Sequence, residues 1–492
     1  MRGVSLLSLT LFLALPSVDA LLLRKRDEPA VVGLDIQRKH VSNPVSRDHQ
    51  RRKRIKTVDQ ILDNEQTLYF CNITLGTPAQ HLRLSIDTGS SDLWCNSASS
   101  SLCSSRGYIC DVSGTYDANS SSTYKYISSD FNISYVDGSA AIGDYVTDSL
   151  RIGGVTLKDF QFGIGYSSSS LEGVLGIGYT RNEVQVNRNG KAPYPNLPQA
   201  MVNDGLINSN AYSLWLNDLD ASTGSILFGG VNTEKYHGQL ETLPIQRVNG
   251  EYAEFIIALT GLALNTSSSS HAYMSEALPA AVLLDSGSSL SYLPDLLVAN
   301  IYDDLNVTYD TSSQTGYVAC DLINKEISLT FTFSSPSISV GINELVIDPG
   351  PNPDGSRPTF MDGTPACVFG IAPAGDSTAV LGDTFLRSAY VVYDLENNEI
   401  SLANTKFNST RDNILEIGTG GDAVPDATHV ADPVTTVAVG VGGARIGGPS
   451  GTGVVLSGSL PTATSTGAAF MPTSIPKHIA AGVAGAGLMF VL

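Results

Sequence analysis

The sequence predicts a mostly β protein built from two related halves. Short apolar runs broken by Gly, Asn, Asp and Ser begin at Thr67, and no long segment with helical periodicity precedes Trp215. The 492 residues include 47 Gly and 20 Tyr, a composition typical of strands and turns. A strand and turn carrying Asp87 return about 200 residues later with Asp285. Together these observations predict an all-β fold with an internal duplication.

The duplicated motif is a strand that delivers an aspartate into a glycine turn. Residues 82–94 read L-R-L-S-I-D-T-G-S-S-D-L-W, and residues 281–293 read A-V-L-L-D-S-G-S-S-L-S-Y-L. In the first copy apolar and polar residues alternate, which is the pattern of a half-buried strand. Gly89 and Gly287 let the backbone turn sharply behind each strand. Each copy therefore predicts a carboxylate held in place where a buried strand ends.

The first half continues with hairpins and a glycine-rich strand. Residues 68–75 and 80–87 are predicted to form two strands joined by Gly76-Thr77-Pro78. Residues 131–139, F-N-I-S-Y-V-D-G-S, run into Asp137-Gly138, a strong hairpin-turn signal that places Tyr135 just before the tip. An apolar strand with glycines follows at Gly173–Gly178, where backbones must pack closely.

The second half repeats this order of elements. The pattern thins near Gly229-Gly230, and residues 240–250 are the expected boundary, so we expect an N-terminal lobe over 55–245 and a C-terminal lobe over 246–405. After the Asp285 turn, a second apolar strand with glycine lies at Ala379–Asp383. No residue-level repeat is traceable outside these motifs, so the duplication is predicted from few points.

The N-terminus predicts export. Arg2, an apolar run over residues 6–15 and small residues ending at Ala20 indicate a signal peptide over residues 1–20. A membrane anchor is the alternative, but the run is too short to span a bilayer. Export fits the six N-glycosylation sequons, although any single one can remain unused. They begin at Asn72, Asn119, Asn132, Asn265, Asn306 and Asn408.

Six cysteines in an exported chain predict three disulfides. Cys103 and Cys110 can close a small ring in a Ser-rich loop, and Cys320 and Cys367 are the expected pair of the second half. Cys71 and Cys95 then remain as a third pair, although fifteen connectivities are formally possible.

Residues 21–56 are basic in an otherwise acidic chain. They hold 11 Lys or Arg against 4 Asp or Glu, about +7 net, whereas the whole chain carries a net charge of -19. Opposite charges on consecutive segments favour an intramolecular complex that weakens as carboxylates become protonated. We interpret residues 21–54 as a pro-segment ending in the basic cluster Arg51–Arg54, after which processing proteases cut. The acidic charge argues against nucleic acid as a partner, although a generic acidic surface also explains it.

The C-terminal part predicts a stalk and an anchor signal. Residues 406–466 are rich in Gly, Thr and Ser and cannot bury enough apolar surface to order themselves, so a flexible stalk is expected. Residues 467–492 have small residues, a polar spacer and an uncharged tail, which match a GPI-attachment signal that is removed. Gly467 is the expected attachment residue, with Ser465 as a competitor. A tail anchor or an irrelevant disordered end are the alternatives.

Two carboxylates on facing turns support acid–base chemistry without a metal or other cofactor. Like charges a few Å apart repel, so one group stays protonated while the other acts as a base. A water held between them is deprotonated by one carboxylate as it attacks a carbonyl, and the other protonates the carbonyl oxygen. The pair titrates as a unit, which predicts activity at acidic pH. This hypothesis requires Asp87 and Asp285 to be neighbours.

Six stretches of the chain, in the same order, resemble the pepsin family of aspartic proteases. They are G-T-P-A-Q at Gly76, D-T-G-S-S-D-L-W at Asp87, S-S-T-Y at Ser121, Y-V-D-G-S at Tyr135, D-S-G-S-S at Asp285 and V-L-G-D-T-F at Val380. The resemblance covers residues 68–405 and is highly specific. It implies a bilobal, pepsin-like aspartic protease fold with the active-site cleft between two lobes, and an aspartic-type endopeptidase acting on proteins or peptides.

The resemblance also implies roles for individual residues. Asp87 and Asp285 would be the catalytic pair. The residues expected to support the catalytic loops are Thr88, Gly89, Ser90, Ser286, Gly287 and Ser288. Those expected in the substrate-binding flap are Tyr135, Asp137 and Gly138. Trp94 would be the hydrogen-bonding and packing neighbour of Tyr135. Val136 departs from the family pattern, where many members carry Gly, and this puts the flexibility of the flap in question.

With its stalk and tail the chain is similar to the GPI-anchored fungal branch, the yapsin-like proteases. The resemblance implies a location at the outer face of the plasma membrane or in the cell wall, and we expect a monomer. Members of this branch often cleave beside Lys or Arg. Asp137 at the flap tip offers a carboxylate that can pair with a basic side chain, although Asp before Gly is also an ordinary turn choice.

Other enzyme classes fit the sequence less well. No G-x-S-x-G elbow appears and the cysteines are expected to be paired, which disfavours a serine or cysteine peptidase. The seven His are scattered, with no zinc motif. A glycosidase also uses two carboxylates but has no need of identical turns. The serious alternative is an inactive member of the pepsin fold that acts as a wall-attached binding or structural glycoprotein. Intact Asp87 and Asp285 weigh against it.

Overall fold

The computed structural model describes residues 30–39, 68–105, 110–135, 139–221, 223–311, 313–351 and 356–437. The predicted signal peptide, the basic cluster of the pro-segment, Asp137 and Gly138 of the flap, and Gly467 with the GPI-attachment signal all lie outside these residues. No helix within the described residues is both long enough and apolar enough to span a membrane.

Strands dominate the described residues of both halves. Those of the first half are β1 (Val32–Lys39), β2 (Leu68–Leu75), β3 (Gln80–Asp87), β4 (Leu93–Asn96), β5 (Lys125–Ser134), β6 (Ala140–Ile152), β7 (Val155–Ser168), β8 (Gly173–Gly176), β9 (Ala211–Trp215), β10 (Thr223–Phe228), β11 (Gly230–Asn232) and β12 (Tyr236–Pro244). Its helices are α2 (Ser101–Ser105), α3 (Val184–Asn189) and α4 (Leu197–Asn203), with short 3-10 turns η1 (Ala118–Ser120) and η2 (Thr180–Asn182).

The second half has the same character. Its strands are β13 (Ile256–Leu259), β14 (Gly261–Thr266), β15 (Ser270–Ala272), β16 (Ala280–Leu284), β17 (Ser291–Leu293), β18 (Thr308–Asp310), β19 (Thr315–Ala319), β20 (Ile327–Thr332), β21 (Ser337–Gly341), β22 (Val346–Ile347), β23 (Ala366–Phe369), β24 (Ile371–Pro373), β25 (Ala379–Leu381), β26 (Ala389–Asp394), β27 (Glu399–Thr405), β28 (Ile414–Glu416) and β29 (Ala427–His429). Its helices are α5 (Asp295–Leu305), α6 (Ile342–Leu345) and α7 (Asp383–Leu386), with the 3-10 turn η3 (Cys320–Asn324).

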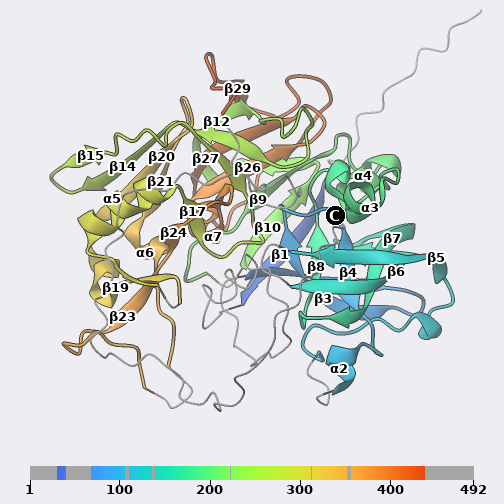
Figure 1. Cartoon of the computed structure of the whole chain (residues 1–492). Coiled ribbons are helices and arrows are strands. Elements are labelled where there is room, and N and C mark those ends of the chain that lie inside the picture. The colour runs from blue at the N-terminus through green and yellow to red at the C-terminus, as the bar shows by residue number, and fades with distance from the viewer. Residues whose placement is uncertain are drawn as a thin grey trace, which may run out of the picture.

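The strands form two lobes joined by one long sheet (Figure 1). Among the described residues this sheet has 14 strands in the order β29-β12-β27-β26-β9-β10-β1-β2-β3-β8-β4-β7-β6-β5. In Figure 1 strands β3 to β8 gather on one side, and α5, β14 and β19 to β24 gather on the other. The second lobe contains a five-stranded sheet, β13-β16-β25-β17-β24, and two four-stranded sheets. The two-lobed, all-β architecture predicted from the sequence is therefore present.

The duplicated motif of the sequence is a duplicated pattern of strand pairing. Strand β3 runs parallel to β8, and β16 runs parallel to β25 in the other lobe. Strands β4 and β17 then return antiparallel to β8 and β25. Glycine is required at both crossings: a Cβ on Gly176 would lie 2.6 Å from Ser91 N, and one on Gly382 would lie 2.4 Å from Ser288 O. The two apolar strands with glycine predicted from the sequence therefore pass directly beside the aspartate loops.

The expected third disulfide is a wrong prediction. Cys103–Cys110 and Cys320–Cys367 are bonded, with Cα–Cα distances of 5.4 and 5.0 Å, but Cys71 and Cys95 are free and buried. Cys71 lies on β2 and Cys95 on β4, and strands β3 and β8 lie between them. Neighbouring strands are about 4.8 Å apart, whereas disulfide Cα atoms lie within about 7 Å. Burial raises the pKa of the Cys71 thiol to about 12 and that of the Cys95 thiol further, so both stay protonated.

The first part of the predicted C-terminal stalk is ordered. Residues 406–437, expected to be flexible, instead pack against the folded body. Within them β28 pairs with β11, and β29 pairs in parallel with β12 at one end of the long sheet. Ile417, Ala423 and Val424 are buried in a cluster with apolar side chains of the body. A partner surface supplied by the body therefore orders a segment whose own composition predicted disorder.

The described part of the predicted pro-segment is an inner strand of the long sheet. Strand β1 pairs with β10 on one side and with β2 on the other. Val32, Leu34 and Ile36 are buried in the main hydrophobic core. Residues 32–39 are therefore integrated into the fold.

Candidate active site

The two motif aspartates meet at the junction of the lobes. Asp87 is the last residue of β3, Asp285 directly follows β16, and their side chains are 0% and 5% exposed. A Cβ on Gly287 would lie 2.5 Å from Asp87 Oδ1 and 3.0 Å from Asp285 Oδ1, and a Cβ on Gly89 would lie 2.5 Å from Asp285 Oδ1. Both carboxylates thus reach the same small volume, which only glycine at positions 89 and 287 leaves free.

Each carboxylate is held by its own loop in the same way. The backbone N–H groups of Gly89 and Gly287 each donate to the Oδ1 atom of the loop's aspartate at 2.9 Å. On the other oxygen, Ser90 Oγ donates to Asp87 Oδ2, and Ser288 Oγ donates to Asp285 Oδ2 at 2.9 Å. Two donors per carboxylate fix its orientation and favour retention of negative charge in a buried site.

Thr88 and Ser286 join the two loops by reciprocal hydrogen bonds across the lobes. Thr88 Oγ1 donates to Leu284 O at 2.9 Å, and Ser286 Oγ donates to Ile86 O at 3.1 Å. Each hydroxyl also accepts a backbone N–H of the opposite loop, from Ser286 N at 3.0 Å and from Thr88 N at 3.2 Å. Four buried hydrogen bonds therefore fix the distance between two segments almost 200 residues apart in the chain.

The predicted flap tyrosine lies beside Trp94. The indole Nε1 of Trp94 donates to Tyr135 Oη at 2.6 Å, and both side chains are buried. They belong to a hydrophobic cluster with Phe131, Tyr145 and Tyr194, which we call the flap cluster. The cluster also contains Ile133, Ala141 and Val174. It connects the flap strands β5 and β6 to the loop that carries Asp87.

Sequence reasoning missed a buried polar network behind Asp87. Asp92, the last acid of the first motif, accepts hydrogen bonds from Tyr145 Oη and Tyr194 Oη, both at 2.9 Å. It also accepts the backbone N–H of Val184 at 2.9 Å. Burial raises the pKa of both tyrosines, and the charge of Asp92 raises it further, so they remain donors. Only the position of Asp92 directly after S-S was visible in the sequence, since Tyr194 follows it by 102 residues.

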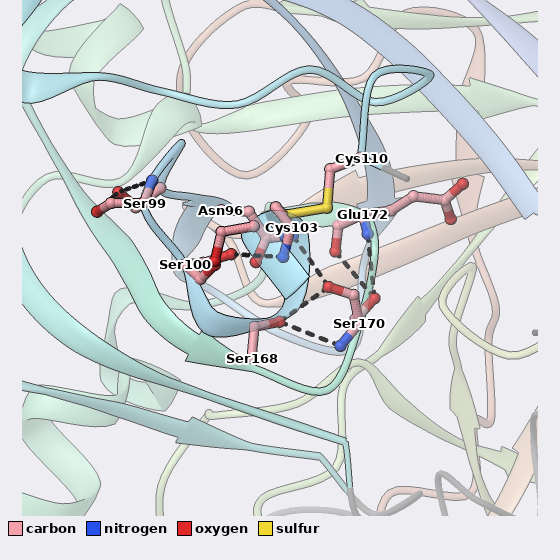
Figure 2. The surroundings of a disulfide bond; sticks show 10 residues. Asn96, Ser99, Ser100, Cys103, Cys110, Ser168, Ser170 and Glu172 are labelled. Atoms are coloured by element: carbon pink, nitrogen blue, oxygen red, sulfur yellow. Dashed lines mark hydrogen bonds between the residues drawn. A yellow bond between two sulfur atoms is a disulfide. The ribbon is translucent and has the colours of Figure 1, made fainter. Parts of the chain in front are cut away.

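The first disulfide anchors a loop next to β8 (Figure 2). Cys103 N donates to Ser100 Oγ at 3.1 Å, and Asn96 Nδ2 donates to Ser170 O at 2.9 Å. Ser170 Oγ in turn donates to Glu172 O at 2.9 Å, directly before β8 begins. The Asn96 side chain therefore links the end of β4 to the turn before β8, and the disulfide lies in the loop that follows β4.

The sequon asparagines differ in exposure. Five of them are exposed, namely Asn72, Asn119, Asn132, Asn306 and Asn408, whereas Asn265 is half-buried. Asn265 Nδ2 already donates to Thr330 Oγ1 at 2.8 Å.

No group of three or more His, Cys, Asp or Glu within the described part of the chain is placed to hold a metal ion.

A comparison with protein families settles the class. The model of the family described as eukaryotic aspartyl protease matches residues 68–405, which is most of the chain. The chain belongs to the eukaryotic aspartyl proteases. It has the pepsin-like fold and is an aspartic-type endopeptidase, with proteins or peptides as substrates.

Several fungal proteases are similar to this chain. The chain is 67% identical over 479 residues to a probable aspartic-type endopeptidase opsB of Aspergillus oryzae, covering 96% of both chains. It is 65% identical to the Aspergillus fumigatus protein of that name, covering 91% of this chain and 90% of the relative. Aspartic proteinase yapsin-3 of Saccharomyces cerevisiae is 38% identical, with 72% of this chain and 69% of yapsin-3 covered.

A solved structure supports the fold independently. The crystal structure of aspartic proteinase from Irpex lacteus superposes with a TM-score of 0.57 and covers 78% of this chain and 100% of that protein. At 20% sequence identity this likeness concerns the fold alone.

Proposed function

We propose that this protease is an exported, surface-anchored zymogen that cleaves peptide bonds at acidic pH between Asp87 and Asp285, with a preference for Lys or Arg beside the cleavage site. The observation that carries the proposal is the symmetrical pair of loops. Four hydrogen bonds between Thr88 and Ser286 and their surroundings bring both carboxylates to one volume.

This geometry supports water activation. Two carboxylates at one buried point share a proton because both cannot ionise freely at that distance. The ionised member removes a proton from a water as it attacks the peptide carbonyl, and the protonated member donates to the carbonyl oxygen. The roles then reverse: the carboxyl that took the water proton gives it to the amine as the C–N bond breaks, and the other carboxylate takes a proton back from a hydroxyl of the tetrahedral intermediate. The chemistry requires one proton on the pair, so activity is confined to acidic pH.

Export, zymogen formation and anchoring are supported by the sequence and by surface exposure. The signal peptide precedes a basic segment over residues 21–54, and five sequon asparagines are exposed. The GPI-attachment signal at 467–492, with attachment at Gly467, would keep the mature enzyme at the outer face of the plasma membrane or in the cell wall.

An acid-pH hydrolysis assay tests the catalytic assignment. Chain freed of its pro-segment is expected to hydrolyse casein at roughly pH 4–6 and to be inhibited by pepstatin. Asp87→Asn should lose at least about a thousandfold in kcat/KM. Asp204→Asn, which changes an exposed acid, is the matched control and should retain activity. Pepstatin-resistant hydrolysis that survives in Asp87→Asn would contradict the proposal.

A peptide library tests the substrate preference separately. The carboxylate of Asp137 at the flap tip is expected to pair with a basic side chain beside the scissile bond. Cleavage sites should therefore be enriched in Lys or Arg, and Asp137→Ala should reduce the enrichment while hydrolysis continues. No enrichment in the wild type, or full enrichment in Asp137→Ala, would refute the preference.

A further inference from the structure

Glu183 is a buried carboxyl group that forms no ion pair with a Lys or Arg in the described part of the chain. It is 0% exposed and immediately precedes helix α3. Its Oε2 atom accepts the backbone N–H of Tyr194 at 2.9 Å, whereas Oε1 has no hydrogen-bond partner. The cations nearest in the sequence are engaged elsewhere: Arg181 with Glu251, Arg188 with Asn132 and Ser134, and Lys191 with Asp130. A carboxylate left so poorly paired would be costly to bury in its charged form.

Asp92 has the partners that Glu183 lacks. Three donors converge on its carboxylate: the hydroxyls of Tyr145 and Tyr194 and the backbone N–H of Val184. Tyr194 bridges the two acids, since its N–H binds Glu183 and its hydroxyl binds Asp92. When two acids share a buried network, the one with more donors keeps the charge and the other keeps a proton. This arrangement assigns the charge to Asp92 and the proton to Glu183.

The network lies directly under the flap. The rings of Tyr145 and Tyr194 meet edge to face with centroids 5.9 Å apart, and Tyr145 meets Phe131 of β5 in the same way at 5.2 Å. These rings belong to the flap cluster with Trp94 and Tyr135, which are hydrogen-bonded to each other. The position of Tyr194 therefore affects the surface on which the flap tyrosine rests.

We propose that Glu183 is a positioning residue that works as a neutral carboxylic acid. Its carboxyl holds the backbone of Tyr194, and Tyr194 with Asp92 holds the flap cluster in the geometry that closes over a substrate. The inference rests on the endopeptidase activity assigned above. The pKa of Glu183 is raised to about 10, chiefly by burial; the Tyr194 N–H lowers it and the charge of Asp92 raises it. Asp92 is the charged group that acts on Glu183, and a charge on Glu183 raises the pKa of Tyr145 and Tyr194 in turn.

Two substitutions separate a neutral acid from a charged one. Glu183→Gln keeps the acceptor for Tyr194 N and the shape of the side chain but cannot ionise. It is expected to retain kcat/KM within about twofold and to keep the wild-type pH profile of activity. Glu183→Ala loses the acceptor and should reduce kcat/KM by roughly tenfold, with a larger effect on KM than on kcat because the flap contacts the substrate. Glu326→Gln changes an exposed acid and is the matched control.

The pH dependence of folding gives a second readout. A carboxyl whose folded pKa is raised keeps its proton when the unfolded chain releases it, so its stabilising effect is complete below the ordinary glutamate value. Above that value the wild type loses up to tenfold in its folding equilibrium constant per pH unit. Glu183→Gln lacks this loss, so it should match the wild type at pH 4 and exceed its stability at pH 7 in urea unfolding.

These measurements overturn the proposal in defined ways. If Glu183→Gln is as impaired as Glu183→Ala, or less stable than the wild type at pH 7, the residue acts as a charged carboxylate. If Glu183→Ala folds and retains full kcat/KM, the residue does not position the flap. Should Glu183→Ala fail to fold, the pH slope of Glu183→Gln still decides. A wild type that hydrolyses nothing would refute the proposed function, whereas the unfolding measurement would still test the neutral acid.

Discussion

Thr88 and Ser286 show how single hydroxyl groups join two lobes. Each donates to a carbonyl of the opposite lobe and accepts an N–H from the opposite loop. Asp87 and Asp285 directly precede Thr88 and Ser286 in the sequence, so a change in this contact also changes the distance between the two carboxylates. The contact is therefore expected to determine both stability and catalytic geometry.

Substituting these hydroxyls tests that coupling. Thr88→Ala and Ser286→Ala each leave buried backbone groups without a partner, which costs about 1–3 kcal/mol of unfolding free energy and lowers kcat/KM. Because the two hydroxyls hold the same pair of loops together, the double variant should lose less than the two single losses combined, by at least about 0.5 kcal/mol. Urea unfolding and peptide hydrolysis measure both quantities, with the exposed Thr156→Ala as control. Fully additive losses would show that the loops are positioned independently.

The residues that the sequence predicts well are those with a local signature. Asp87 and Asp285 stand in two copies of one short motif, and the structure brings both carboxylates to one volume. Glu183 carries no such signature, because its relation to Asp92 and Tyr194 exists only after the chain folds. The absence of a bond between Cys71 and Cys95 was also beyond prediction, since it depends on which strands lie between them.

At the scale of elements, composition predicted strands and turns correctly but misjudged residues 406–437. Segments poor in aromatic residues rarely order themselves, because they bury too little apolar surface. Here the rest of the folded chain supplies the apolar surface that the segment itself lacks. Ile417, Ala423 and Val424 are buried in a cluster that includes Trp215 and Tyr390. Contacts with the rest of the chain therefore offset the entropy lost on ordering, and the composition of the segment alone does not reveal them.

Truncation tests what the ordered segment 406–437 contributes to stability. A chain ending at Thr405 loses three buried apolar side chains and two strand pairings, whereas a chain ending at Val437 keeps them. Fully burying one side chain such as Val or Ile contributes about 1.5–3 kcal/mol, so the shorter chain should unfold several degrees lower. Thermal unfolding and binding of a hydrophobic dye compare the two. Equal melting temperatures would show that residues 406–437 are only an appendage.

At the scale of the whole molecule, strand β1 brings part of the basic segment into contact with the acidic remainder of the chain. Residues 21–56 carry about +7 against -19 for the entire chain, and β1 places part of this basic segment inside the long sheet. Arg38 at its end lies in the field of Glu344 and Asp220, which oppose the lowering of its pKa by burial. Apolar burial and strand pairing therefore hold β1, and the opposite net charges of the basic segment and the rest of the chain add an attraction that depends on pH.

Cleavage after Arg54 should release the basic segment in a pH-dependent way. At neutral pH the carboxylates of the body are ionised and attract it, whereas protonation at roughly pH 4 removes most of this attraction while the arginines stay charged. The cleaved peptide should co-elute with the enzyme at pH 7 and separate from it at pH 4 in size-exclusion chromatography with mass detection. The experiment uses the Asp87→Asn variant, because this variant should not digest the released peptide. Co-elution at both pH values would show that strand pairing and apolar burial alone hold β1, and separation at both would show that β1 needs its covalent connection.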